Sequence, residues 1–291
     1  MIWVTGSKGM LGTDLVAALK REGHAVLETD IEVDVCYPQA LMNAAEGHAI
    51  DWVINCCAYT AVDKAESDET QATALNSDGA ANIASVARTI GARMIHISTD
   101  YVFDGLAEQP YVETDPVSPI GVYARTKELG ERRVTASAPN AFILRTAWLY
   151  GAHGGNFVYS MLRLMGERET LGVVADQEGS PTWTQTLCRV IAEMIKQDVT
   201  QGGIYHVTNR GRASWHEFAA AIHAQAIEHH LLSRPCKVNP ISTEDYPTPA
   251  RRPPCSVLNC RKIEALLNIQ LPTWQESLAA FIAVEAAATQ R

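Results

Sequence analysis

Short apolar runs alternate with longer stretches of helical spacing along the first half of the chain. The apolar runs predict strands at residues 2–4, 25–27, 52–55, 93–97 and 141–145. Between them, apolar residues recur three and four positions apart, which predicts helices at residues 11–21, 74–90 and 123–136. This alternation predicts parallel βαβ units in a doubly wound α/β sheet, whose strands end at one common edge, where ligands bind.

The pattern loosens after about residue 150. Ser214 and Glu217 form a predicted capping box at the start of a helix. The prolines of residues 246–254 predict a loop there. We expect residues 1–150 to form a domain around the sheet and residues 151–291 a smaller α/β lobe, with some later segments returning to the sheet. The elements predicted after residue 150 are helices at 157–168, 186–196, 214–229 and 274–287 and a strand at 171–174.

Composition narrows the class of protein. The chain has 24 Lys and Arg against 33 Asp and Glu, a formal net charge of −9, which argues against a nucleic-acid partner. No apolar stretch approaches the length of a membrane span, and we expect no signal peptide. The seven cysteines contain no Cys-x-x-Cys pair, so zinc is poorly supported. Cys56 and Cys57 are expected to be buried thiols of a reducing compartment, and a cytoplasmic location follows.

A glycine-rich segment joins the first strand to the first helix. Gly6, Gly9 and Gly12 follow the spacing Gly-x-x-Gly-x-x-Gly. In that context the first glycine allows a tight turn, the second a close approach to a pyrophosphate, and the third close helix–sheet packing. The free amides of the helix amino terminus bind phosphate. The segment predicts a dinucleotide site, with Gly6, Gly9, Met10 and Leu11 at the cofactor.

The ends of the second and third strands carry the other predicted cofactor contacts. Asp30 closes the second strand, where an acid accepts hydrogen bonds from the adenosine ribose and favours NADH. Lys8 favours NADPH instead, because it could neutralise the 2′-phosphate of that cofactor. The preference between NADH and NADPH therefore stays open. The remaining expected contacts are Asp34 and Val35 near the adenine, and Cys57, Ala58 and Tyr59 after the third strand.

The candidate chemistry lies after the fourth strand. Tyr123 and Lys127 are one turn apart on one helix face, where an ammonium group lowers the pKa of a tyrosine. Such a tyrosine can exchange a proton with a sugar hydroxyl or carbonyl. Thr99 ends the strand, and its hydroxyl can hold a substrate carbonyl against the nicotinamide. Asp100 and Tyr101 follow directly and are expected to contact the same ligand.

Two further candidates have competing interpretations. Trp148 follows the fifth strand, where it could form an aromatic wall for a sugar or base or could simply pack. Arg251 and Arg252 could pair with a diphosphate or lie in a solvated loop.

These motifs, in this order, resemble the extended short-chain dehydrogenase/reductase family and, within it, the dTDP-4-dehydrorhamnose reductases, which complete dTDP-L-rhamnose synthesis. One departure is Met10, where these reductases often carry glutamine. The resemblance spans nearly the whole chain, through residues 59–66, 98–105, 145–150, 176–182 and 246–253.

The resemblance implies a Rossmann-like dinucleotide-binding domain and reduction of the 4-keto group of dTDP-4-dehydro-6-deoxy-L-mannose with NADPH or NADH. Tyr123 is then the proton donor. Lys127 lowers its pKa and binds the nicotinamide ribose, and Thr99 orients the carbonyl. The substrate contacts are Thr99, Asp100, Tyr101, Tyr123 and Trp148. Some members are magnesium-bridged dimers. The sequence shows no convincing carboxylate cluster, so no metal ligand is assigned, and the chain is expected to be a monomer or homodimer.

Two alternatives stay open. Related nucleotide-sugar dehydratases place a glutamate where this chain has Tyr101, and epimerases retain their cofactor through a complete redox cycle. The regulatory β subunit of methionine adenosyltransferase resembles these reductases without catalysing the reaction. The intact set of Thr99, Tyr123 and Lys127 favours catalysis.

Overall fold

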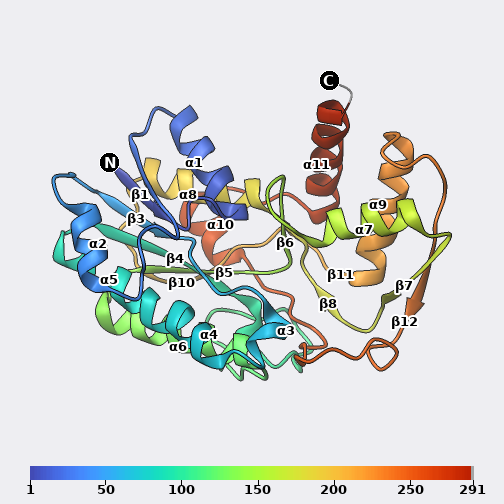
Figure 1. Ribbon diagram of the computed structural model, residues 1–291, viewed down its shortest axis with the longest axis horizontal. Helices are drawn as coiled ribbons and strands as arrows, with labels where there is room; N and C mark the ends of the chain where they lie inside the picture. The colour runs from blue at the N-terminus through green and yellow to red at the C-terminus, as the bar shows by residue number, and fades with distance from the viewer. Residues whose placement is uncertain (290–291) are drawn as a thin grey trace.

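Six parallel strands form the central sheet of the protein (Figure 1), in a computed structural model that describes residues 1–289. Their order across the sheet is β10–β5–β4–β3–β1–β2. The doubly wound α/β architecture predicted from the sequence is thereby confirmed. The strands are β1 (Ile2–Thr5), β2 (Val26–Thr29), β3 (Trp52–Asn55), β4 (Arg93–Thr99), β5 (Phe142–Thr146) and β10 (Gly203–His206).

Helices cover both faces of this sheet (Figure 1). Side chains alternate along β1, so that Ile2 and Val4 enter one apolar cluster and Trp3 enters the other. The central sheet is therefore flanked by two apolar cores, one under each helical layer. One layer consists of α1 (Met10–Arg21), α8 (Thr184–Lys196) and α10 (Arg261–Leu267), and the other of α2 (Pro38–Ala45), α5 (Ala80–Thr89) and α6 (Val122–Ser137).

The strand order places a topological switch point between β1 and β3. From β1 the chain continues to β2 on one side, and β3 then pairs with β1 on the other side. The loops that follow β1 and β3 therefore diverge from neighbouring strand ends, which is where open α/β sheets bind ligands. The last residues of the paired strands lie in register, among them Thr5, Thr29 and Asn55.

A smaller lobe follows beside the carboxyl ends of the strands (Figure 1). Its core is aromatic, with Tyr150, Phe218 and Phe281 buried together. The predicted capping box of Ser214 and Glu217 is present at the start of α9. The lobe contains α7 (Phe157–Glu167), α9 (Trp215–Glu228), α11 (Trp274–Thr289) and the short strands β6 (Leu149–Tyr150), β7 (Thr170–Val174), β8 (Glu178–Gly179), β9 (Thr182–Trp183), β11 (Ala213–Ser214) and β12 (Lys237–Ile241).

Several local features differ from the sequence-based expectation. The helix predicted at 74–90 begins as a π-helical segment, η1 (Ala74–Gly79), after the short helices α3 (Val62–Ala65) and α4 (Glu69–Thr73). Cys56 and Cys57 are only partly buried, because they lie in the loop after β3 and not within the strand. Strand β10, which was not among the predicted strands, returns from the second half of the chain to the sheet beside β5. The division at residue 150 stays a prediction.

Two other expectations concern loops and membranes. Residues 246–254 contain no helix or strand, as their prolines predicted. Within residues 1–289, no helix is long and apolar enough to cross a membrane.

Candidate active site

The glycine loop packs against the end of β3 without space for side chains. A Cβ atom at Gly6 would lie 2.7 Å from the Cys57 amide nitrogen, and Gly6 has a φ of 69°, in the left-handed region. A Cβ atom at Gly12 would lie 2.1 Å from the Gly6 carbonyl oxygen. Helix α1 begins after Gly9 with no side-chain cap, so its first amides are available to a ligand. This cradle fits the diphosphate of a dinucleotide.

The end of β2 holds a small charged network. The Asp30 carboxylate accepts hydrogen bonds from the Lys8 amide at 2.8 Å and the Ile31 amide at 2.9 Å. The Lys8 ammonium group lies 2.9 Å from a Glu32 carboxylate oxygen. Glu32, which the sequence analysis did not single out, therefore compensates the charge that could have attracted a 2′-phosphate.

The loop after β3 is held by a buried asparagine. Asn76, in η1, accepts a hydrogen bond from the Tyr59 amide at 2.8 Å and donates to the Tyr59 carbonyl and the Thr126 hydroxyl. The structure thus fixes residues 57–59 against α6 beside the glycine loop. The sequence analysis missed Asn76. It is a polar residue within the predicted helix, and only the structure shows that it is 1% exposed.

The other expected adenine contacts lie in the bend after β2. The Asp34 carboxylate accepts the Cys36 amide at 2.8 Å. The Val35 side chain is buried against the position of Gly79. Their contact with an adenine ring stays a prediction.

Thr99, Tyr123 and Lys127 meet where α6 crosses the end of β4. The Lys127 ammonium group donates to the Ile97 carbonyl of β4 at 2.6 Å. The Tyr123 ring packs edge-on against the Tyr101 ring, with centroids 6.0 Å apart. The Thr99 hydroxyl is close enough to the Tyr123 phenol to lower its pKa. Residues separated in the sequence thereby form one polar cluster at the carboxyl edge.

The pKa values of this cluster differ from the sequence-based expectation in one respect. Burial raises the pKa of Tyr123 to about 12, and Lys127 does not lower it as expected. The physical reason is that burial disfavours the charged phenolate, and this is the largest effect on the pKa of Tyr123. Burial lowers the pKa of Lys127 itself to about 8. At neutral pH, Tyr123 is therefore a phenol and Lys127 a cation, which suits proton donation.

Asp100 is a buried acid beside the threonine. Asp100 is the first residue of the short helix η2 (Asp100–Val102), and it is 2% exposed. Burial raises its pKa to about 7. The Thr99 hydroxyl lies 3.0 Å from one Asp100 carboxyl oxygen and accepts a hydrogen bond from the Tyr101 amide at 3.2 Å. Near neutrality Asp100 is thus partly protonated and can exchange donor and acceptor roles with Thr99.

Trp148 is constrained by two residues of the smaller lobe that the sequence analysis missed. Its ring stacks on Trp215, with centroids 3.4 Å apart and an interplanar angle of 2°. A Cβ atom at Gly179 would lie 2.4 Å from the Trp148 ring, so only glycine leaves room for it. Trp148 also has a φ of 47°, an uncommon backbone conformation for a bulky residue. The local sequence offers no signal for this stacking, which arises from tertiary packing.

The two arginines of the proline-rich loop differ. Arg252 donates to the Asp63 carboxylate at 2.8 Å, and the Ala250 amide donates to the same group at 3.2 Å. Arg252 therefore fastens the loop to α3 and is not a freely solvated residue. Arg251 is exposed.

Magnesium finds no support at this site. Within residues 1–289, no three His, Cys, Asp or Glu side chains are grouped to hold a metal ion.

Known proteins resemble the chain along its whole length. The family model described as the RmlD substrate binding domain matches residues 1–286. A dTDP-4-dehydrorhamnose reductase of Burkholderia thailandensis is 38% identical over 283 residues, which cover 94% of this chain and 95% of the relative.

Solved structures give the same result. A dTDP-4-dehydrorhamnose reductase of Clostridium acetobutylicum is 38% identical with a TM-score of 0.90, over 97% of this chain and 98% of that chain. One from Bacillus anthracis, in complex with NADP, is 36% identical with a TM-score of 0.91, over 97% and 98%. The chain therefore belongs to the dTDP-4-dehydrorhamnose reductase (RmlD) family of extended short-chain dehydrogenases/reductases.

Proposed function

We propose that the protein reduces the 4-keto group of dTDP-4-dehydro-6-deoxy-L-mannose to give dTDP-L-rhamnose, using a reduced nicotinamide cofactor. The observation that carries this proposal is the meeting of Thr99, Tyr123 and Lys127 beside the glycine cradle. Membership of the reductase family supports the choice of substrate. All three residues come from one chain, so the proposal needs no second subunit, and a monomer or homodimer remains the expectation.

The residues proposed to hold the cofactor follow the switch point of the sheet. The uncapped start of α1 and Gly6, Gly9, Met10 and Leu11 would face the diphosphate. Further contacts are assigned to the ends of β2 and β3 and to α6, through Asp30, Asp34, Val35, Cys57, Ala58, Tyr59, Tyr123 and Lys127. When bound, the reduced nicotinamide supplies the hydride that reaches the 4-keto carbon.

We propose NADH as the preferred cofactor. The carboxylates of Asp30 and Glu32 lie together after β2, and Lys8 is paired with Glu32. A ribose hydroxyl can donate to a carboxylate, whereas a 2′-phosphate would be repelled by it. The relative from Bacillus anthracis was solved with NADP, so the two cofactors must be compared directly on this chain.

In the proposed mechanism, Tyr123 donates its phenolic proton to the oxygen that becomes negatively charged as the carbonyl is reduced. Burial keeps that proton in place at neutral pH by raising the pKa of Tyr123 to about 12. The Lys127 ammonium group, bonded to the Ile97 carbonyl, is assigned to the nicotinamide ribose. The phenolate then recovers a proton from solvent.

Thr99 and Asp100 orient the carbonyl in this scheme. When Asp100 is protonated, it can donate to the Thr99 hydroxyl across their 3.0 Å separation. The threonine proton is then free for the substrate oxygen. Asp100, Tyr101 and the Trp148–Trp215 pair are assigned to the sugar nucleotide. Tyr101 stands where a dehydratase would need its glutamate, and this absence of a partner for elimination favours plain reduction.

The test is turnover of dTDP-4-dehydro-6-deoxy-L-mannose with NADH and, separately, with NADPH. We expect stoichiometric loss of the reduced cofactor and a product with the mass of dTDP-L-rhamnose. An isomerised or dehydrated sugar without net cofactor consumption would favour an epimerase or dehydratase. Cofactor binding with no turnover, together with a stable complex with a synthetase, would favour the regulatory-subunit alternative.

A further inference from the structure

A glutamate one turn beyond the active-site lysine is buried without a role in the mechanism above. Tyr123, Lys127 and Glu131 are spaced four residues apart on α6, so they share the helix face that packs on β4. Lys127 is 2% exposed and Glu131 is 4% exposed. A carboxylate is costly to bury unless it is paired and hydrogen-bonded, so its partners are informative.

Two buried groups hold this carboxylate. The Ser98 hydroxyl donates to it at 2.5 Å. The Arg145 guanidinium group of β5 donates twice, with Nε at 2.9 Å from Oε1 and Nη2 at 2.7 Å from Oε2. Since Lys127 donates to the carbonyl of Ile97, two successive turns of α6 are bonded to two successive residues of β4. The ammonium group and the carboxylate are thus fixed relative to each other.

The charges around Lys127 come from every element packed against it. The loop after β3 contributes the thiols of Cys56 and Cys57. Strand β4 contributes His96, whose pKa burial holds well below its usual value, so the ring is neutral. Helix α6 contributes the phenol of Tyr123 and the carboxylate of Glu131. Burial lowers the pKa of Lys127 to about 8, and among these groups the Glu131 carboxylate acts most strongly in the opposite direction.

We propose that Glu131 is a positioning residue that keeps Lys127 protonated and seated on the Ile97 carbonyl, and that Ser98 and Arg145 act through it. This inference rests on the proposed function for its kinetic consequence. Arg145 pairs with the Glu131 carboxylate, and the carboxylate in turn balances the buried ammonium group. Without Glu131, the lysine would lose its proton at a lower pH, and the ammonium group assigned to the nicotinamide ribose would become a neutral amine.

The test is the pH dependence of kcat in Glu131→Gln, from about pH 6 to about pH 10. We expect the alkaline fall in kcat to move to lower pH by about one unit, so that kcat near pH 9 drops about tenfold relative to the wild type. Near pH 6, where Lys127 is protonated in both proteins, kcat should differ by about threefold at most. Glu131→Asp retains the charge and should restore the wild-type alkaline fall.

Glu128→Gln is the matched control. Glu128 lies on the same helix and pairs with Arg132 at 2.6 Å, so this variant also breaks a glutamate–arginine pair. Its pH profile should match that of the wild type. An unshifted profile in Glu131→Gln, accompanied only by a lower Tm, would overturn the proposal and leave a structural role.

Two further measurements keep the inference testable if Glu131→Gln folds poorly or if the substrate assignment fails. The double variant Glu131→Gln/Arg145→Gln leaves no uncompensated buried charge at the pair and should shift in the same direction. Calorimetric titration with NADH across the same pH range needs no sugar substrate. Affinity should weaken at a lower pH in Glu131→Gln than in the wild type, and Lys127→Met should abolish this pH dependence. Identical NADH titrations in the wild type and in both Glu131 variants would overturn the role of Glu131 even if the keto sugar is reduced.

Discussion

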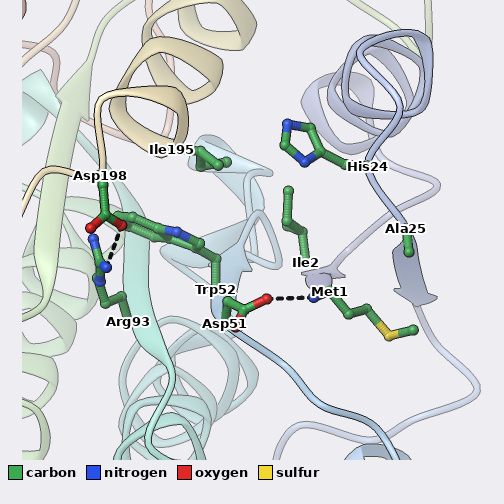
Figure 2. A pocket seen from close by; sticks show the side chains of 9 residues that line it. All are labelled: Met1, Ile2, His24, Ala25, Asp51, Trp52, Arg93, Ile195 and Asp198. Atoms are coloured by element: carbon green, nitrogen blue, oxygen red, sulfur yellow. Dashed lines mark hydrogen bonds and ion pairs between the residues drawn. The ribbon is translucent and has the colours of Figure 1, made fainter.

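The two ends of the central sheet differ in how their charged groups are arranged. At the amino ends of the strands, the amino group of Met1 lies 2.5 Å from the Asp51 carboxylate. Arg93 pairs with Asp198, and its guanidinium carbon lies 4.9 Å from the Trp52 ring centroid. Figure 2 shows these side chains around a cavity of about 290 Å³. Each of these charges has a partner and partial contact with water.

At the carboxyl end of β4 and the facing turns of α6, the ionisable groups are buried and their pKa values are displaced. Burial raises the pKa of Asp100 to about 7 and that of Tyr123 to about 12, and it lowers the pKa of Lys127 to about 8. A cavity with paired surface charges requires no function, whereas buried groups with displaced pKa values are typical of catalytic sites. In this molecule the proposed chemistry is therefore marked by buried charge and not by an open cavity.

The largest effect is expected from removing the proton donor. Tyr123→Phe should lower kcat by about 10²–10⁴-fold, the usual contribution of a general acid. Cofactor affinity should change little, since the glycine cradle is intact. Steady-state kinetics and calorimetric titration with NADH measure the two effects. Tyr159→Phe removes a hydroxyl that donates to Glu285 at 2.8 Å in the smaller lobe, and it serves as the control. Full activity in Tyr123→Phe would contradict the mechanism.

The sequence predicted the parts of the carboxyl edge that depend on local spacing. Gly6, Gly9 and Gly12 are encoded within one strand–loop–helix segment, and Tyr123 and Lys127 within one helical turn. Thr99 was predictable because it ends an apolar run. In these cases the period of a single element determines where the side chain lies.

The remaining features depend on contacts between distant segments. Asn76 donates a hydrogen bond to Thr126, 50 residues away. Trp215 stacks on Trp148, which lies in a distant part of the sequence, so local spacing could not predict this contact. The direction of the Tyr123 pKa shift was also wrong in the sequence-based expectation. Spacing indicated the nearby lysine, but burial has the larger effect and is set by tertiary packing.

Replacing the buried Asp100 should raise the stability of the protein while lowering its activity. The folded-state pKa of Asp100, about 7, lies above its usual value of 3.8, so the folded protein resists ionising this group. The wild type therefore loses stability as the pH rises from about 4 to about 7. Asp100→Asn removes this penalty and should raise the free energy of unfolding at pH 8 by about 2–4 kcal/mol. Its kcat/KM should fall, since Asp100 is also assigned to a contact with the sugar nucleotide.

Urea unfolding of the two proteins at pH 5 and pH 8 checks the stability prediction. The advantage of Asp100→Asn should be larger at pH 8. An equal difference at both pH values would show that the buried carboxyl group does not set the pH dependence.

A smaller change is expected at Glu32, which lies beside the proposed ribose site. Glu32→Gln releases the Lys8 ammonium group from its partner and removes one negative charge beside the proposed ribose site. The ratio of kcat/KM for NADPH to that for NADH should rise by about threefold to tenfold, with the larger effect at low salt. Glu193→Gln breaks a comparable exposed pair with Lys196 on α8 and should leave the ratio unchanged. An unchanged ratio in Glu32→Gln would remove Glu32 from cofactor selection.

The smallest effect is expected at the amino end of the sheet. Asp198→Asn removes the charge that pairs with Arg93, while asparagine tolerates the left-handed backbone of this position, where φ is 51°. The pair is solvent-accessible, with the Asp198 side chain 73% exposed, so the loss of stability should be below about 1 kcal/mol. Both kcat and the pH profile should match those of the wild type. A shifted alkaline limb in this variant would mean that charges at the two ends of the sheet are coupled, and that burial at the carboxyl edge alone does not set the pKa values there.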